Sequence, residues 1–71
     1  MNIIEYRNQA SKTALELARA IDQNDRVKMN SLSGSLSEMV DVILNDDRLY
    51  DFVGSKRMTL FADLCMRGIM A

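Results

Sequence analysis

Hydrophobic residues recur every three or four positions through the first third of the chain, which is the period of an α-helix. They form one narrow stripe, while glutamate, glutamine, lysine and arginine residues occupy the opposite side. The pattern predicts an amphipathic helix over residues 3–23. Its stripe consists of Ile3, Ala10, Ala14, Leu17 and Ile21, bordered by Tyr6 and Ala18.

Alanines spaced four residues apart lie along this stripe, at positions 10, 14 and 18. Small residues at that spacing let a second helix approach closely, either within one chain or across a dimer interface. Packing within the chain is the commoner use in soluble proteins, and a dimer interface is the alternative. The residues assigned to helix packing or dimerisation are Ala10, Ala14, Leu17, Ala18 and Ile21.

A second hydrophobic stripe runs through a segment rich in serine. Its members keep helical phase across one glycine and four serines, and a loop would have no reason to preserve that phase. We therefore favour one helix over 26–44, capped by Asn24 or Asp25. The alternative is a helix that starts at Ser35, because Ser35 and Glu38 form a capping box. The stripe consists of Met29, Leu32, Leu36, Met39, Val40 and Ile43.

A short helical segment is predicted over residues 46–53. Asp46 or Asp47 can accept hydrogen bonds from the free backbone N–H groups of its first turn, and Gly54 closes it. Two aspartates four residues apart, Asp47 and Asp51, repel each other mildly in a helix. This segment is therefore less strongly specified by its sequence than the longer helices.

The last predicted helix spans residues 56–67, with Ser55 as its N-cap and Gly68 as its end. Its hydrophobic face is wider than those of the first two helices. A face this wide implies either burial on two sides or an exposed patch that binds a partner. The residues assigned to partner binding are Met58, Phe61, Met66, Ile69 and Met70.

Together these elements predict an all-α fold, with residues 1–71 as a single helical domain. The first two long helices form a hairpin, and the C-terminal helix lies across it. A chain of 71 residues buries a small core, so such proteins gain stability from very good helix packing or from association. We therefore expect a homodimer that forms a larger helical bundle.

The residue types needed for catalysis or metal binding are scarce. The chain has no histidine and a single cysteine, Cys65, on the hydrophobic face of the last helix. This composition excludes serine–histidine and cysteine–histidine nucleophiles and makes a structural zinc site implausible. We expect a protein that is not an enzyme and that needs no cofactor or metal.

The charge balance argues against a dedicated nucleic-acid binder, because 9 basic residues face 10 acidic ones for a net charge of −1. The best anion-binding feature is Gly54-Ser55-Lys56-Arg57, where Lys56 and Arg57 offer possible phosphate contacts at a helix start. The favoured function is a protein-interaction module, a regulator, inhibitor or adaptor of the phage or bacterial accessory type. The alternative is a dimeric nucleic-acid-binding regulator that uses Lys56 and Arg57.

The expected location is the cytoplasm. No window approaches the roughly 20 apolar residues of a membrane span, so no membrane partner is expected. The first residues lack the basic region and apolar core of a secretory signal. A lone cysteine also fits a reducing compartment.

Overall fold

The computed structural model describes residues 2–70, and at position 70 the backbone only. Four helices make up almost all of this part: α1 (Ile3–Asp22), α2 (Arg26–Leu44), α3 (Asp47–Val53) and α4 (Ser55–Met70). No strand occurs within residues 2–70, so the prediction of an all-α fold is confirmed. None of these helices combines the length and the hydrophobicity needed to cross a membrane.

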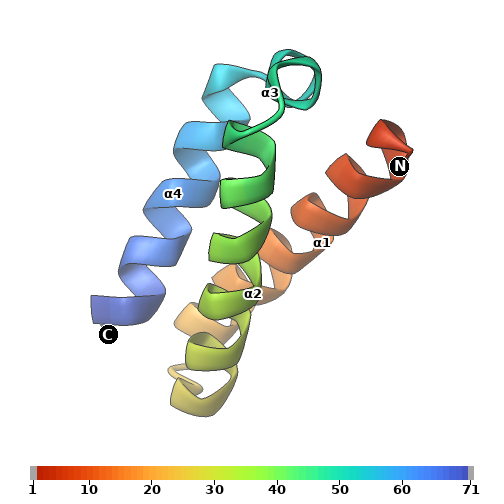
Figure 1. Ribbon diagram of the computed structural model, residues 1–71. Coiled ribbons are helices and arrows are strands. Elements are labelled where there is room, and N and C mark those ends of the chain that lie inside the picture. The colour runs from red at the N-terminus through yellow and green to blue at the C-terminus, as the bar shows by residue number, and fades with distance from the viewer. Residues whose placement is uncertain (1, 71) are drawn as a thin grey trace.

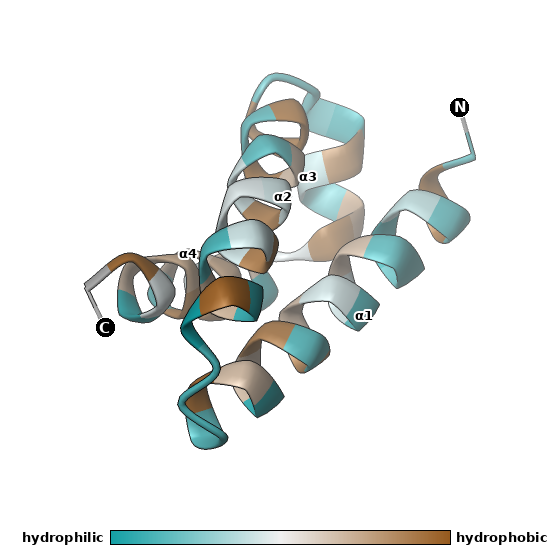
Figure 2. Ribbon diagram, turned by 90° about the horizontal axis from the view of Figure 1, so that it is seen from below, coloured by the Kyte–Doolittle hydropathy of each residue, from teal (hydrophilic) through white to brown (hydrophobic). Residues whose placement is uncertain are grey.

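The arrangement of the helices differs from the predicted one in a single respect. Helix α2 lies at the centre, α4 runs beside it in the opposite direction, and α1 crosses behind it obliquely (Figure 1). It is therefore α1, and not the C-terminal helix, that crosses its neighbour. In the view from below, the hydrophilic segments of α1 lie on the side away from α2 and α4 (Figure 2).

The turn between α1 and α2 uses both residues that were candidates for a cap. Asn24 adopts a positive φ of 54°, and its N–H donates to the carbonyl of Ile21, while the N–H of Asp25 donates to that of Ala20. This is the Schellman arrangement that ends many helices. Asp25 then begins α2, because its Oδ1 accepts a hydrogen bond from the N–H of Lys28 at 3.2 Å.

The short helix α3 begins at Asp46 and ends at Gly54. Asp46 Oδ1 accepts from the N–H groups of Arg48 and Leu49 at 3.1 and 3.2 Å, so Asp46 is the cap and Asp47 is the first helical residue. Gly54 has a φ of 90°, a backbone conformation that favours glycine, and turns the chain directly into α4.

Helix α2 is continuous through its serine-rich segment, from Arg26 to Leu44. The prediction of one helix is confirmed, and the capping box at Ser35 does not start a new one. The predicted stripe lies toward the core, with Leu36 and Ile43 fully buried. One further residue is buried that the pattern did not include, Ser33, which lies beside the stripe and faces α4.

Helix α4 departs from its predicted bounds at both ends. It starts at Ser55, which is a helical residue and not a cap, and it continues through Gly68 to the end of the described chain. Gly68 was expected to stop the helix, but it is buried against Ser33 and Leu17. Its role is therefore to let α4 approach α2 and α1 closely, a use of glycine that requires no positive φ.

One hydrophobic cluster joins all four helices. Side chains of α1, α2 and α4 meet along its length, and α3 closes one end. The buried members are Ala10, Ala14, Leu17, Ala20, Met29, Leu36, Ile43, Leu49, Val53, Met58, Phe61, Leu64 and Cys65.

Candidate interaction surfaces

The residues assigned to partner binding divide between the core and the surface. Met58 and Phe61 are only 6% and 1% exposed, so neither can contact a partner in the folded monomer. The wide face of α4 is covered on one side by α1 and α2, and these two side chains lie on that covered side. Met66 and Ile69 are exposed, while the side chain of Met70 lies outside the described part of the chain.

The alanine stripe of α1 is used inside the monomer. Ala10, Ala14 and Leu17 are buried in the shared core, and Ala18 and Ile21 are half-buried against it. Because their surfaces already face α2 and α4, the centre of this stripe is not open to a second copy. Close helix packing within one chain is the role that the folded monomer shows.

An exposed hydrophobic strip follows the contact between α2 and α4. Ser33 and Cys65 mark where the two helices meet, since the Cys65 thiol donates to the Ser33 carbonyl at 3.8 Å. Helical spacing extends this side along α2 to Val40 and Leu44 and along α4 to Ala62 and Ile69. We define the α2–α4 strip as Val40, Leu44, Ala62, Met66 and Ile69.

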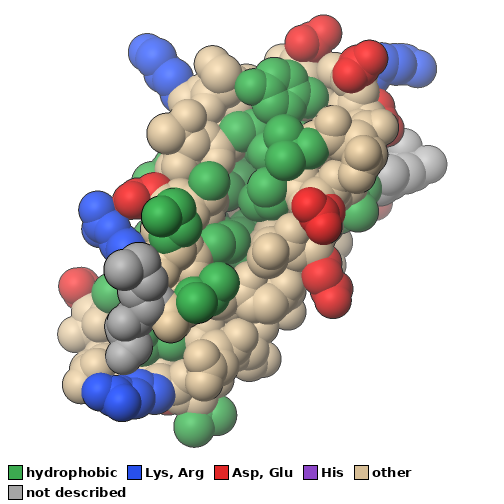
Figure 3. All heavy atoms as spheres, turned by 60° about the vertical axis from the view of Figure 1, so that its left-hand side comes forward, with side chains coloured by type: hydrophobic (Ala, Val, Ile, Leu, Met, Phe, Trp, Pro, Cys, Tyr) green, Lys and Arg blue, Asp and Glu red, His purple; other side chains and the backbone are tan. Residues whose placement is uncertain are grey.

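Three members of the α2–α4 strip are large and open to solvent, with exposed fractions of 55% for Leu44, 61% for Met66 and 70% for Ile69. The side of the molecule on which α4 comes forward shows hydrophobic side chains gathered in a long row, with charged groups along its edges (Figure 3). An apolar row rimmed by charge is typical of a protein-interaction surface.

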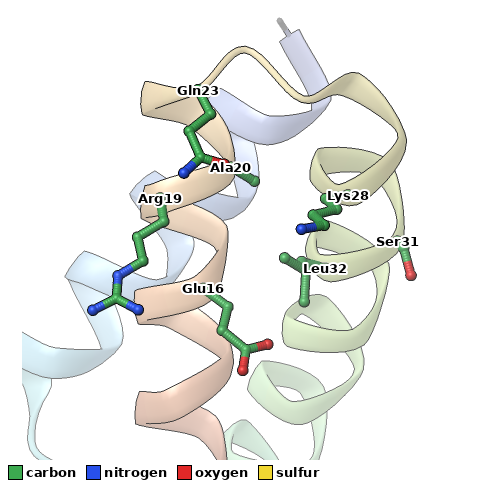
Figure 4. A pocket seen from close by; sticks show the side chains of 7 residues that line it. All are labelled: Glu16, Arg19, Ala20, Gln23, Lys28, Ser31 and Leu32. Carbon is green, nitrogen blue, oxygen red and sulfur yellow. The ribbon is translucent and has the colours of Figure 1, made fainter.

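Besides this strip, an open pocket lies between the C-terminal half of α1 and the start of α2. Its volume is about 560 Å³, and Glu16 and Lys28 turn toward it while Arg19 and Ser31 point away (Figure 4). Ala20 and Leu32 are the two hydrophobic residues of its lining. It is the solvated mouth of the helical hairpin, and the mixed charges around it favour no class of ligand.

Another open pocket, which we call the α1–α4 groove, has a volume of about 320 Å³. Its apolar lining comes from both helices, and its charged residues lie toward the C-terminal ends of those helices. Arg67 there is held by Asp63 at 3.1 Å in an exposed ion pair one turn apart. The lining residues are Leu15, Ala18, Arg19, Ile21, Asp22, Leu64 and Arg67.

An arginine stacked on an aromatic ring lies between α1 and α3. The guanidinium carbon of Arg7 is 4.7 Å from the centre of the Phe52 ring, within the range of a cation–π contact. Its Nε is buried without a hydrogen-bond partner, and its Nη2 has one long contact, 3.4 Å, to Asn8 Oδ1. The sequence did not indicate this pair, because 45 positions separate the two residues and no local spacing links them.

The candidate phosphate contacts, Lys56 and Arg57, are exposed in the first turn of α4. They do not share one side of that helix, since neighbouring helical residues point about 100° apart. Arg57 lies one turn before Leu60 and two turns before Leu64, so it falls on the same side of α4 as these two leucines. Phosphate contact by these two side chains stays a prediction.

Two groups have a raised pKa, the buried Cys65 and the partly buried Tyr6. Burial raises the pKa of the Cys65 thiol, which disfavours the reactive thiolate. Burial also raises the pKa of the Tyr6 hydroxyl, with a further contribution from the negative charge of Glu38. Both shifts keep these groups neutral, which suits packing residues and gives no sign of a nucleophile.

Comparisons of the chain with models of protein families, with curated proteins and with solved structures find no match.

Proposed function

We propose that this protein is a small helical interaction module that works by binding another protein, as a regulator, inhibitor or adaptor. The observation that supports this function best is the α2–α4 strip. Leu44, Met66 and Ile69 each expose hydrophobic surface along the α2–α4 strip, although the fold has an internal core in which to bury such side chains. A partner that covers the strip removes this surface from water.

We also propose that, without its partner, the protein forms a homodimer in which two copies cover their strips against each other. A symmetric contact of this kind requires only that the surface be self-complementary, which a narrow apolar row between charged rims can be. The partner then competes with the second copy for the same residues, so the two binding events exclude each other.

The test is an affinity pull-down from the cell of origin, with the C-terminus of the bait left free. The wild-type chain is compared with a double variant, Met66→Glu with Ile69→Glu, which places two charges on the strip. Because carboxylates resist burial against an apolar partner, the variant is expected to lose the specifically captured protein. Circular dichroism first establishes that both baits are equally helical.

The matched control is Val27→Glu, because Val27 is the most exposed of the large hydrophobic side chains, at 80%, and lies outside the strip. It adds one such charge at another surface and should capture the partner as the wild type does. Equal capture by all three baits would contradict the strip as the binding surface. Capture of nucleic acid alone would instead favour the alternative function.

The alternative, a dimeric nucleic-acid-binding regulator that uses Lys56 and Arg57, has less support. Asp46, Asp47 and Asp51 lie at the same end of the molecule in and before α3, so the local charge is mixed. Nucleic-acid binding through phosphates requires a positive surface and weakens steeply with salt. We therefore prefer the protein partner.

A further inference from the structure

The two edges of the α2–α4 strip carry different charges. On the α2 edge, Asp41 is exposed, and α2 has no basic residue after Lys28. On the α4 edge, Lys56 is exposed, while Asp63 is neutralised by Arg67, which contacts it at 3.1 Å. Figure 3 shows acidic side chains along the α2 side of the apolar row and side chains of both signs along the α4 side. One edge is therefore acidic, and the other presents Lys56, which has no ion-pair partner in the part of the chain that the structure describes.

Lys56 and Asp41 lie level with each other along the strip. Helices α2 and α4 run in opposite directions, and the contact of the Cys65 thiol with the Ser33 carbonyl fixes their register. Asp41 comes 8 residues after Ser33, and Lys56 comes 9 residues before Cys65. These separations correspond to roughly 12 and 13 Å of α-helix, in the same direction from that contact. The acidic and the basic group therefore lie at one height, on opposite edges of the strip.

Two symmetric arrangements let two copies cover their strips face to face, because the twofold axis lies in the plane of the contact. If the axis runs along the strip, α4 of each copy lies on α2 of the other, and groups at one height meet. If the axis runs across the strip, α2 lies on α2, so the two acidic edges face each other. Opposite charges across an interface favour an arrangement, and like charges disfavour it. The charges on the two edges therefore favour the axis that runs along the strip.

We infer that the homodimer has its twofold axis along the α2–α4 strip, with two symmetric ion pairs that join Lys56 of each copy to Asp41 of the other. This inference rests on the proposed homodimer and names the groups that orient it. The apolar residues of the strip supply the affinity. The ion pairs lie at the exposed rim, where such pairs add little affinity but select the orientation.

The serine-rich segment of α2 suits this arrangement. Asp63 and Arg67 lie within one turn of Cys65, so they are level with the part of α2 around Ser33. Residues 31–37 of α2 carry no charge. In the dimer, the Asp63–Arg67 pair of one copy therefore lies opposite small uncharged side chains of the other, and no like charge opposes either member of the pair.

The experiment reverses each charge in turn, with Lys56→Glu and Asp41→Lys in the full chain. Light scattering over a range of concentrations gives the dimer dissociation constant. Each reversal turns both ion pairs into like-charge contacts, so it should weaken the dimer about tenfold. The matched control is Lys12→Glu, which changes the net charge as Lys56→Glu does but lies exposed on α1, outside the strip, and should leave the dimer unchanged. Circular dichroism first establishes that all variants are equally helical.

The decisive measurement uses an equimolar mixture of the Lys56→Glu and Asp41→Lys chains. In their heterodimer, the introduced glutamate meets the introduced lysine, and the native Asp41 of one chain meets the native Lys56 of the other. Both contacts are attractive again, so the mixture should dimerise within about threefold of the wild-type affinity. Native mass spectrometry identifies the heterodimer by its mass. This rescue cannot arise from contacts within one chain, because each chain keeps a single substitution.

The possible failures separate this inference from the proposed dimer. A wild-type monomer at high micromolar concentration would contradict the homodimer, and the inference with it. A wild-type dimer that both reversals leave unchanged, or a mixture that forms no heterodimer, would overturn the orientation alone. Equal weakening by Lys12→Glu would assign the effect to net charge and would also overturn the pairing of Lys56 with Asp41.

Discussion

Ser33 of α2 and Gly68 of α4 pack directly against each other, and a Cβ atom at position 68 would overlap the Ser33 hydroxyl. Leu17 of α1 lies beside the same point, 3.2 Å from where that Cβ would be. Three helices therefore converge on a glycine and a serine. Small residues at a helix crossing let the backbones approach closely, which explains both the buried serine and the glycine inside α4.

Gly68→Ala is expected to destabilise the protein. The added methyl group meets Ser33 and Leu17, and the resulting overpacking outweighs the better helix propensity of alanine. We expect a net loss of about 1–2 kcal/mol in the free energy of unfolding. Urea unfolding followed by circular dichroism measures it.

Gly34→Ala is the matched control for that substitution. Gly34 lies in the interior of α2, and nothing stands within 4 Å of where its Cβ would be. Here only the better helix propensity of alanine acts, so the free energy of unfolding should rise by about 0.5–1 kcal/mol. Equal effects of the two substitutions would contradict the close approach at Gly68.

Ser33→Ala is expected to be neutral or to stabilise by up to about 1 kcal/mol. Within the described chain the Ser33 Oγ is buried and has no hydrogen-bond partner, so removing it leaves nothing unpaired. The same change should reduce the cost of Gly68→Ala, because the overlapping hydroxyl is gone. A double-mutant cycle measures this coupling, and strictly additive effects would show that the two side chains do not interact.

Asp46 and Asp47 give a second matched pair. Asp46→Ala removes the side chain that accepts from two backbone N–H groups and should cost about 1 kcal/mol. Asp47→Ala removes only a favourable charge in the first turn, worth a few tenths of a kcal/mol at most on this exposed residue. Thermal unfolding of the two variants, compared side by side, should rank Asp46→Ala as the less stable.

Stability is expected to fall at alkaline pH because of Cys65 and Tyr6. Burial raises the pKa of both groups in the folded state, so the unfolded chain releases their protons at a lower pH. Stability is therefore complete below the ordinary pKa of each group and is lost as the pH rises through the folded-state pKa. Urea midpoints at about pH 7 and about pH 11 compare the stability below and above the ordinary pKa values of both groups.

The variants Cys65→Ala and Tyr6→Phe separate the two contributions. Each removes one titrating proton, and the loss of stability between the two pH values should shrink accordingly. An unchanged loss in the double variant would assign the alkaline effect to other groups. The quantity to compare is the change in the free energy of unfolding between the two pH values, because both substitutions also alter the stability at neutral pH.

The proposed homodimer is tested by light scattering at high micromolar concentration. The wild type is expected to show twice the monomer mass, because burying the α2–α4 strip of two copies removes Leu44, Met66 and Ile69 from water. Met66→Glu with Ile69→Glu should give the monomer mass, and Val27→Glu should not. A wild-type monomer at this concentration would remove the dimer proposal.

The helices themselves were predictable from the sequence, because their signals are local. The apolar phase from Met29 to Ile43 depends only on 3.6-residue periodicity, and it outweighed four serines and a glycine. The turn at Asp22–Asp25 and the caps near Asp46 likewise depend on residues a few positions apart. The structure then showed which of two adjacent candidates performs each role.

The function of Gly68 could not be read from the sequence. A glycine near the end of a helical pattern is most often a C-cap, and nothing nearby indicates that Ser33, 35 positions earlier, lies opposite. Likewise, the sequence of α4 does not indicate which side of its wide hydrophobic face other helices cover. Met58 and Phe61 proved to be core, and Met66 and Ile69 surface, because α1 and α2 approach only one side.

The sequence by itself determined that the protein is helical, where its long helices run and which stripes they bury, since these follow from spacing along one chain. Only the tertiary structure decided that α1 is the crossing helix, that Arg7 meets Phe52, and that an apolar strip and a groove stay open on either side of α4. The physical reason is that contacts between helices depend on the angle and depth at which they pack, which residues far apart in the chain set jointly.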